Sequence, residues 1–361
     1  MNTSTSRTQA VLTLALPFAF SIFVLGSMAS GQATQDPRPA RFVAQPTSTA
    51  AFQVDYIDVG QGDAIYLHAS DGTDILIDGG PRSAGPTVVA HLQDAGVDDI
   101  EVMVLTHPDA DHEGGLIDVL RSAIPVESWI SNGQHDDTLT YQALITETMA
   151  RGLTPTPAVA GQSYRWGDVQ ALVLNPQPVL DPDQNDNSVT LLVVYGNVHF
   201  LFTGDITTDA EQVLLETGTA SLRLALPAEV LKVAHHGSRN SSSADFLEAV
   251  NPEVAIISVG AGNPYGHPAP ETLDRLAAAG ANVYRTDKYG TITVISDGQS
   301  YEVLADFVVF LPFMARQPTS TNTRSLLNQP LPRTTPTVPP PDRSAPTNRP
   351  PATLSPEASG N

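Results

Sequence analysis

The chain has 361 residues, of which 41% are hydrophobic, so it can bury a substantial core in one large domain or two smaller ones. It contains no cysteine, which excludes disulfides and thiolate metal sites, so any bound metal must be held by His, Asp or Glu. The net charge is −21, and because residues 1–50 carry +2 and residues 316–361 carry +3, about −26 falls on residues 51–314. A region this acidic has no general electrostatic attraction for nucleic acid, although a bound metal pair would reverse the sign locally.

The first residues have the pattern of an export signal. A basic residue precedes an apolar run over residues 10–26, and small residues follow it, with Ser27 and Ala29 spaced as at a signal-peptidase site. The alternative is an uncleaved membrane anchor, for which a run of about 17 residues is short. We predict a signal or N-terminal anchor over residues 1–33, a linker over residues 34–50, and a secreted or cell-envelope, extracytoplasmic location.

Between residues 51 and 306, strand-type runs alternate with helical segments, separated mostly by Gly, Asp and Asn. The pattern predicts strands over residues 52–58, 64–68, 74–77, 100–105, 189–195, 198–202, 230–233, 254–258, 282–284 and 291–295. It predicts helices over residues 87–95, 207–215, 243–250 and 270–279. Two β-rich halves flanked by helices indicate an α/β fold, a four-layer αββα sandwich in one domain.

The C-terminal region, residues 307–361, begins with a short apolar segment and continues as a tail rich in Pro, Thr and Ser. Residues 316–361 hold 11 of the 30 prolines and no apolar periodicity, so we expect this tail to be disordered. A spacer that associates with the cell envelope and a dispensable end are both consistent with this composition.

A dense group of metal-ligand residues follows the predicted strand 100–105. His107, Asp109, Asp111 and His112 place four candidate ligands within six residues, in a chain that has only nine histidines. The turn after a strand lets several side chains converge, so this group predicts a metal site.

Three further segments carry candidate site residues. Asp205 ends an apolar strand after Gly204, where a carboxylate could bridge two cations. His235 and His236 follow another strand, and adjacent residues on an extended backbone face opposite ways, so we expect one to bind metal and the other to line the pocket or act as an acid. His267 lies in a proline-bounded loop and could be a ligand or contact a phosphate or leaving group.

Carboxylates also lie at strand ends beside glycines near the start of the domain. These are Asp58, Asp63 and Asp78, and we expect them to support the ligands rather than bind metal directly.

These segments, in this order, resemble the metallo-β-lactamase superfamily, and in particular the domain at the C-terminal end of ComEC/Rec2-type competence proteins. The resemblance spans about residues 52–300 and rests on residues 57–64, 76–80, 106–115, 187–188, 202–206, 231–238, 265–268 and 286–293. In the superfamily's usual His-x-His-x-Asp-His motif, Asp109 stands where the second histidine would be, as is typical of the competence branch. This oxygen ligand makes manganese credible beside zinc. A further histidine expected before the Gly-Asp pair is absent, and residues 186–188 occupy its region.

The resemblance implies a centre with two divalent metal ions, Zn or Mn. Its expected ligands are His107, Asp109, Asp111, His112, the bridging Asp205, and His235 or His236, with Asn187 in support. It implies attack by a hydroxide held between the metals, with His267 and the free one of the two adjacent histidines protonating the leaving group. Asp111, His236 and His267 are thus the expected catalytic residues.

We therefore predict an exported metal-dependent hydrolase that cleaves a phosphodiester or small-molecule substrate, with single-stranded DNA as one candidate. The sequence lacks the channel domain of the competence proteins, so we expect a free-standing phosphodiesterase or nuclease. A cell-surface phosphorylcholine-type esterase is the main alternative, and a non-catalytic surface binding protein is a further one. Asp109 and the missing histidine argue against a β-lactamase. The sequence indicates no oligomeric state.

Overall fold

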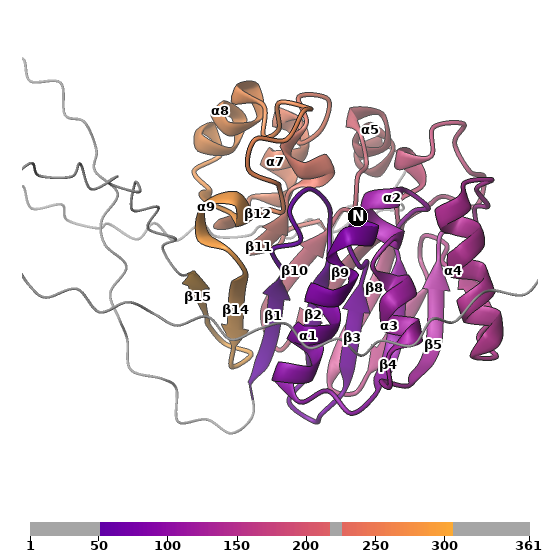
Figure 1. Cartoon of the computed structure of the whole chain (residues 1–361). Helices are drawn as coiled ribbons and strands as arrows, with labels where there is room; N and C mark the ends of the chain where they lie inside the picture. The colour runs from indigo at the N-terminus through magenta and orange to yellow at the C-terminus, as the bar shows by residue number, and fades with distance from the viewer. Residues whose placement is uncertain (1–50, 217–225, 306–361) are drawn as a thin grey trace, which may run out of the picture. The chain divides into compact units, whose positions relative to one another are not determined.

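Two β-sheets pack face to face, and helices cover the outer face of each (Figure 1). The computed structural model describes residues 51–216 and 226–305. The predicted four-layer αββα sandwich is confirmed. The predicted signal, linker and tail lie outside the described residues. Within the described ranges, no helix combines the length and apolar character needed to cross a bilayer.

The first sheet has eight strands in the order β15-β14-β1-β2-β3-β4-β5-β6. Strands β3 to β6 run parallel to one another, whereas β1 pairs antiparallel with both β2 and β14. The parallel strands deliver the loops that follow them to one edge of the sheet. The bounds are β1 Phe52–Tyr56, β2 Ile65–His68, β3 Asp74–Ile77, β4 Ile100–Leu105, β5 Val126–Ser131, β6 Pro155–Pro157, β14 Ile292–Ser296 and β15 Tyr301–Ala305.

The second sheet has seven strands in the order β13-β12-β11-β10-β9-β8-β7. Strands β10 to β13 are parallel, and β7 to β10 pair antiparallel. A tight turn at residues 196–197 joins β9 to β10 in an antiparallel hairpin. The bounds are β7 Ser163–Trp166, β8 Val169–Asn175, β9 Thr190–Tyr195, β10 Val198–Phe202, β11 Val230–Lys232, β12 Val254–Ile257 and β13 Asn282–Arg285.

Helices on each outer face bury an apolar side against their sheet. The first sheet is covered by α1 Gly85–Ala95, α3 Leu116–Arg121 and α4 Leu139–Ala150, and the second by α5 Thr208–Glu216, α7 Ala244–Val250 and α8 Pro270–Ala278. Short helices lie in loops: η1 Arg82–Ala84, α2 Ala110–Glu113, η2 Asn185–Asn187, η3 Ala234–Gly237 and α9 Thr286–Tyr289.

The main core lies between the sheets, where alternate residues of both point inward. Phe52 of β1 meets Phe200 of β10 edge to face, with ring centroids 5.3 Å apart, and Tyr56 lies 6.2 Å from Phe202. These contacts fix the two sheets relative to each other, and so fix the loops that leave their parallel strands.

Several elements between residues 116 and 175 were not predicted from the sequence. β15, near the end of the domain, was not predicted either. β6 and β7 are the edge strands of their sheets, and most of their residues are partly or fully exposed, so they lack a buried apolar face. α4 buries only Tyr141, Leu144 and Thr148. Weak periodicity is the physical reason that β6, β7 and α4 were omitted, whereas α3 and β8 bury most of their residues and were missed despite that burial.

Candidate metal centre

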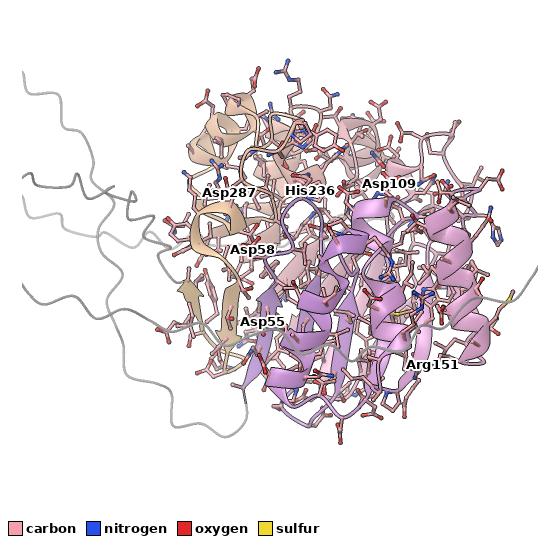
Figure 2. All side chains as sticks on the ribbon, viewed as in Figure 1. Asp55, Asp58, Asp109, Arg151, His236 and Asp287 are labelled. Carbon is pink, nitrogen blue, oxygen red and sulfur yellow. The ribbon has the colours of Figure 1, made fainter. Side chains whose placement is uncertain are left out.

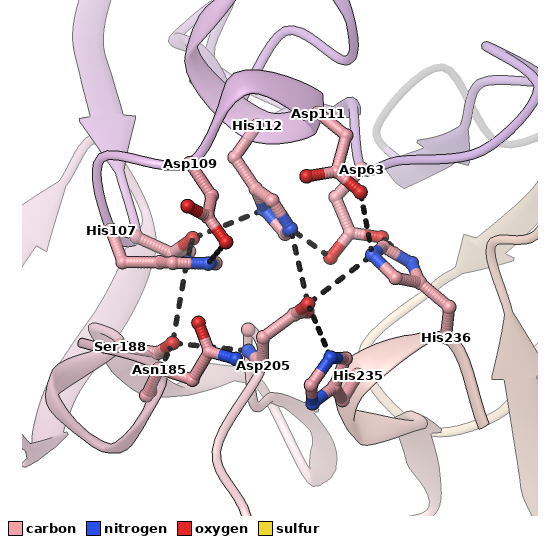
Figure 3. Close-up of polar contacts among 12 residues, drawn as sticks. Asp63, His107, Asp109, Asp111, His112, Asn185, Ser188, Asp205, His235 and His236 are labelled. Atoms are coloured by element: carbon pink, nitrogen blue, oxygen red, sulfur yellow. Dashed lines mark hydrogen bonds and ion pairs between the residues drawn. The ribbon is translucent and has the colours of Figure 1, made fainter. Parts of the chain in front are cut away.

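The candidate site residues meet at the edge of the sandwich where β3, β4, β10 and β11 end. Asp78 follows β3, His107 follows β4, and Asp205 follows β10, while His236 belongs to the turn after β11. Figure 2 shows Asp109 and His236 at the same end of the two sheets. The strand ends thereby bring together residues that the sequence spreads over four segments (Figure 3).

His112 is fully buried and held from one side of its ring. Its Nδ1 lies 2.8 Å from Oδ2 of Asp78. The same Oδ2 accepts a hydrogen bond from the Thr106 hydroxyl at 2.7 Å, and Oδ1 of Asp78 accepts one from the Thr106 backbone N–H at 2.8 Å. Its Nε2 has no hydrogen-bond partner and lies 3.3 Å from Oδ2 of Asp205. Because the carboxylate accepts a hydrogen bond from Nδ1–H, Nε2 of the neutral ring presents a lone pair to the centre.

His107 and His236 repeat this arrangement. Nδ1 of His107 lies 3.1 Å from the Thr106 hydroxyl and 3.3 Å from that of Ser188, and Nδ1 of His236 lies 2.9 Å from the carbonyl oxygen of Ser258. Neither Nε2 atom has a hydrogen-bond partner, although both rings are buried. Leaving a buried polar atom without a hydrogen bond costs free energy. The Nε2 atoms of His107, His112 and His236 all lie buried in one place without such a bond, which indicates a site for a bound cation.

Carboxylates complete the centre. Oδ2 of Asp205 lies 3.2 Å from Nε2 of His236, which is 3.5 Å from Oδ2 of Asp111. Asp109 is half exposed, with its Oδ2 3.6 Å from Nε2 of His107. Four groups of three residues have candidate ligand atoms within 4.8 Å of one another. They are His107 with His112 and Asp205, Asp111 with His112 and His236, Asp63 with Asp78 and His112, and Asp63 with Asp205 and His236. This nitrogen and oxygen set fits divalent cations, and Asp205 is placed to serve two of them.

The paired histidines do not face opposite ways, which corrects the expectation from an extended backbone. His235 and His236 have φ values of 51° and 52°, in the left-handed region, and form part of the tight turn η3. Nε2 of His235 therefore also approaches Asp205 Oδ2, at 3.8 Å. His235 remains 26% exposed whereas His236 is buried, so His236 is the one enclosed among the other ligands.

His267 lies beside these two, outside the buried cluster. Its ring centroid is 5.7 Å from that of His235, and Tyr265, which is 67% exposed, stacks on its other side at 5.8 Å. The Asn263 side chain accepts a hydrogen bond from the His267 backbone N–H and donates one to its carbonyl. Nδ1 of His267 has no hydrogen-bond partner.

Two of the expected supporting residues are placed elsewhere. Asp58 is exposed, and its carboxylate accepts the backbone N–H of Gly60 within its own turn. Asn187 is buried, but its amide bonds the backbone of Asp181 and Asp183 and so braces the loop before β9. Short polar side chains favour such local backbone bonds, and this explains both departures.

Residues that the sequence did not single out also line the centre. Lys232, the last residue of β11, is fully buried, and its ammonium contacts Asp63 and lies 3.7 Å from Oδ1 of Asp205. Ser188 accepts the backbone N–H of Asp205 and contacts His107. Asn185 faces the space between His107 and Asp205 in Figure 3. A lysine inside an apolar strand just before paired histidines was the available signal for Lys232.

The electrostatics of the cluster favour positive charge. Burial opposes ionisation of Asp205, but His236 and His112 outweigh it and hold the pKa of Asp205 well below its usual range. Burial would lower the pKa of His236, yet Asp205 and Asp63 raise that pKa to about 9. The pKa of His112 is likewise raised well above its ordinary value, by Asp205 and Asp78 against the effect of burial. Carboxylates that stabilise imidazolium in this way would also stabilise a cation.

His235 and His267, which lie at the outside of the cluster, have lowered rather than raised pKa values. Burial lowers the pKa of His235, and burial together with the neighbouring His235 and His236 lowers that of His267. Both rings therefore favour the neutral form, in which one nitrogen can accept a hydrogen bond or a proton and the other can donate a hydrogen bond.

Comparison with known proteins identifies the family of the chain. The family model described as "Metallo-beta-lactamase superfamily" matches residues 57–261, more than half of the chain. The chain belongs to the metallo-β-lactamase superfamily. This superfamily comprises metal-dependent hydrolases, and its matched segment contains the ligand cluster, Asp205 and the paired histidines.

Curated relatives include a competence protein and the product of a ComE operon. ComE operon protein 3 of Bacillus subtilis is 29% identical over 300 residues, which cover 77% of this chain and 37% of that protein. Competence protein ComA of Neisseria gonorrhoeae is 34% identical over 250 residues, covering 69% and 33%. The chain thus spans about a third of the length of the curated relatives that it matches. Among solved structures, CmlA, a diiron β-hydroxylase of Streptomyces venezuelae, aligns at 14% identity and a TM-score of 0.45, over 69% of this chain and 55% of that one.

Proposed function

We propose that this superfamily member hydrolyses phosphodiester bonds, with single-stranded DNA as its candidate polymer substrate. The observation that carries the proposal is the set of three buried Nε2 atoms, on His107, His112 and His236, aimed at the Asp205 carboxylate with no hydrogen-bond partner of their own. Zinc or manganese ions bound there would supply Lewis acidity, which activates water and neutralises charge on phosphoryl oxygens.

The oxygen-rich part of the centre supports a phosphoryl substrate rather than a lactam. Asp109 takes the place of the superfamily's second histidine, and Ser188 lies in the region of a further one, with its hydroxyl on Nδ1 of His107. Oxygen ligands favour harder cations such as manganese, which also suit phosphate oxygens. One of the curated relatives is named Competence protein ComA, and another is named Recombination protein 2, which supports nucleic acid as the polymer.

The residues around the centre have distinct roles in this proposal. Asp111, His112 and His236 would hold one cation and His107 and Asp109 the other, and Asp205 would serve as a ligand to either. His267 stands beside the cluster with an unpaired Nδ1. Because its lowered pKa favours the neutral ring, in this proposal it first takes up a proton and then donates that proton to the leaving oxygen. Tyr265, exposed and stacked on His267, offers an aromatic face on which a nucleobase could stack.

Phosphorylcholine-type esters are the second candidate substrate, and the charge of the domain favours them. The net charge of about −26 on residues 51–314 would repel a long polyanion wherever it extends beyond the metals. A small or zwitterionic ester would not experience this repulsion. Export and envelope association remain part of the proposal, and they rest on the sequence patterns of residues 1–33 and 307–361.

A substrate panel tests the proposal. The purified chain, loaded with manganese or zinc, is incubated with single-stranded DNA, bis(p-nitrophenyl) phosphate, p-nitrophenylphosphorylcholine and a chromogenic cephalosporin. We expect cleavage of the first two, and loss of both metal uptake and cleavage when Asp111 and His112 are replaced by alanine. Cleavage of the phosphorylcholine ester alone would select the second candidate. Cleavage of the cephalosporin alone, or a protein that takes up no metal by elemental analysis, would overturn the proposal.

A further inference from the structure

Lys232 is a buried cation inside a centre built to hold other cations. It is one of two lysines in the chain, and its side chain has no exposure to solvent. Its ammonium contacts the carboxylate of Asp63, lies 3.7 Å from Oδ1 of Asp205, and donates to the carbonyl oxygen of Gly204 at 3.2 Å. Lysine is almost never fully buried unless it is paired. The burial of this lysine beside candidate cation ligands therefore needs a structural explanation.

Asp63 lies behind the candidate ligands, not among their free nitrogens. Its carboxylate oxygens are 3.5 Å from Nδ1 of His236 and 3.9 Å from Nδ1 of His112, the nitrogens that already have hydrogen-bond partners. Its backbone N–H donates to the carbonyl oxygen of Asp111 at 3.1 Å. The pair formed by Asp63 and Lys232 therefore supports the ligands from the side opposite to the cations.

The two oxygens of Asp205 face different partners. Oδ2 is the oxygen near His112, His235 and His236, at 3.3, 3.8 and 3.2 Å. Oδ1 has no hydrogen-bond partner, and the ammonium of Lys232 is its charged neighbour. The position of Lys232 thus distinguishes the two oxygens and turns Oδ2 toward the histidines.

The charge of the centre also balances with Lys232 present. Two divalent cations would neutralise four carboxylates, and the ammonium neutralises the remaining one. The five carboxylates are Asp63, Asp78, Asp109, Asp111 and Asp205.

We propose that Lys232 is a positioning residue of the metal centre, whose ammonium attracts Oδ1 of Asp205 and so leaves Oδ2 facing the histidines that would bind the cations. The inference rests on the metal centre of the proposed function. The inference predicts the direction in which metal affinity changes when Lys232 is removed. By electrostatics alone, loss of a positive charge close to bound cations should raise the metal affinity. Loss of a positioning residue should lower it.

Two variants separate these effects. Lys232→Met removes the ammonium and keeps much of the side-chain volume. The double variant Asp63→Asn with Lys232→Met has the net charge of the wild type and leaves neither partner as an unpaired buried ion. Lys288→Met is the matched control, because Lys288 is the other lysine of the chain and is exposed.

The measurements are zinc and manganese affinity by competition with a chromogenic chelator, metal content by elemental analysis, and thermal unfolding of the chelator-treated protein. We expect both Lys232 variants to bind metal at least about tenfold more weakly than wild type, with Lys288→Met unchanged. Should the single variant fail to fold, the charge-matched double variant carries the test by itself, and its unfolding curve reports its fold.

Higher or unchanged metal affinity in the Lys232→Met variant would overturn the inference. Wild-type affinity in the double variant would also overturn it, because Lys232 would then serve only as a counter-ion for Asp63. A wild-type protein that binds no metal would instead overturn the proposed function. The two failures are therefore distinguishable in one set of measurements.

Discussion

The imidazole of His112 joins two carboxylates through its two nitrogens: Nδ1 lies 2.8 Å from Oδ2 of Asp78, and Nε2 lies 3.3 Å from Oδ2 of Asp205. Asp78 comes from the end of the first sheet and Asp205 from the end of the second. The ring of His112 therefore spans the junction of the two sheets, and its orientation depends on the packing between them.

Replacing Asp78 with asparagine should weaken metal binding by about 10 to 100-fold, because the amide cannot hold the His112 tautomer as a carboxylate does. Asn tolerates the left-handed backbone at this position, where φ is 58°, so the fold should persist. Chelator competition measures the affinity. Asp58→Asn is the matched control, since Asp58 is exposed, and equal affinities in the two variants would refute the role of Asp78.

Replacing Gly62 with alanine should disturb the centre through the backbone. An added Cβ would lie 2.2 Å from the carbonyl oxygen of Asp111, and φ is +136°. We expect weaker metal binding and a loss of about 1 to 3 kcal/mol of unfolding free energy, measured by denaturant titration. Gly60→Ala is the control, because Gly60 has φ +74° with no neighbour within 4 Å of the added Cβ, and its metal affinity should not change.

Alanine variants of the paired histidines, His235 and His236, should differ in metal content. His236→Ala removes a buried ring whose Nε2 lies near both Asp111 and Asp205, so we expect it to lose at least one metal equivalent by elemental analysis. His235→Ala removes the more exposed ring, and we expect it to keep the metal bound by His236. The reverse result would assign the enclosed ligand to His235.

His267→Gln should lower kcat by about 10² to 10⁴-fold while the metal content stays at the wild-type value, because we place His267 as a proton donor and not as a ligand. Steady-state kinetics with bis(p-nitrophenyl) phosphate and a more acidic phenol ester tests this point. The loss should be smaller for the better leaving group, and equal losses for both esters would argue against proton donation.

Metal removal should destabilise the protein in proportion to occupancy. At a free metal concentration 100 times Kd, binding adds about 2.7 kcal/mol to the unfolding free energy, so EDTA should lower Tm. In the variant with alanine at Asp111 and His112, metal and EDTA should give the same Tm. Differential scanning calorimetry measures both, and a metal-dependent shift in that variant would place binding elsewhere.

The sequence predicted the sandwich because most of its strands and helices have clear apolar patterns, and ten strands and four helices were expected near their observed positions. It failed for the edge strands β6 and β7 and for α4, which bury few side chains. It identified His107 to His112 as a ligand group because those residues are adjacent in the chain, and adjacency is visible without a fold.

The sequence by itself determined the fold class, the types of ligand and the absence of thiolates. Only the tertiary structure decided which nitrogen of each histidine is free, that His235 and His236 turn to the same carboxylate, that Asp58 and Asn187 lie apart from the centre, and that Lys232 is buried within it. The physical reason is that local periodicity records how each element is buried, whereas these contacts join different strands of two sheets and depend on their register and packing.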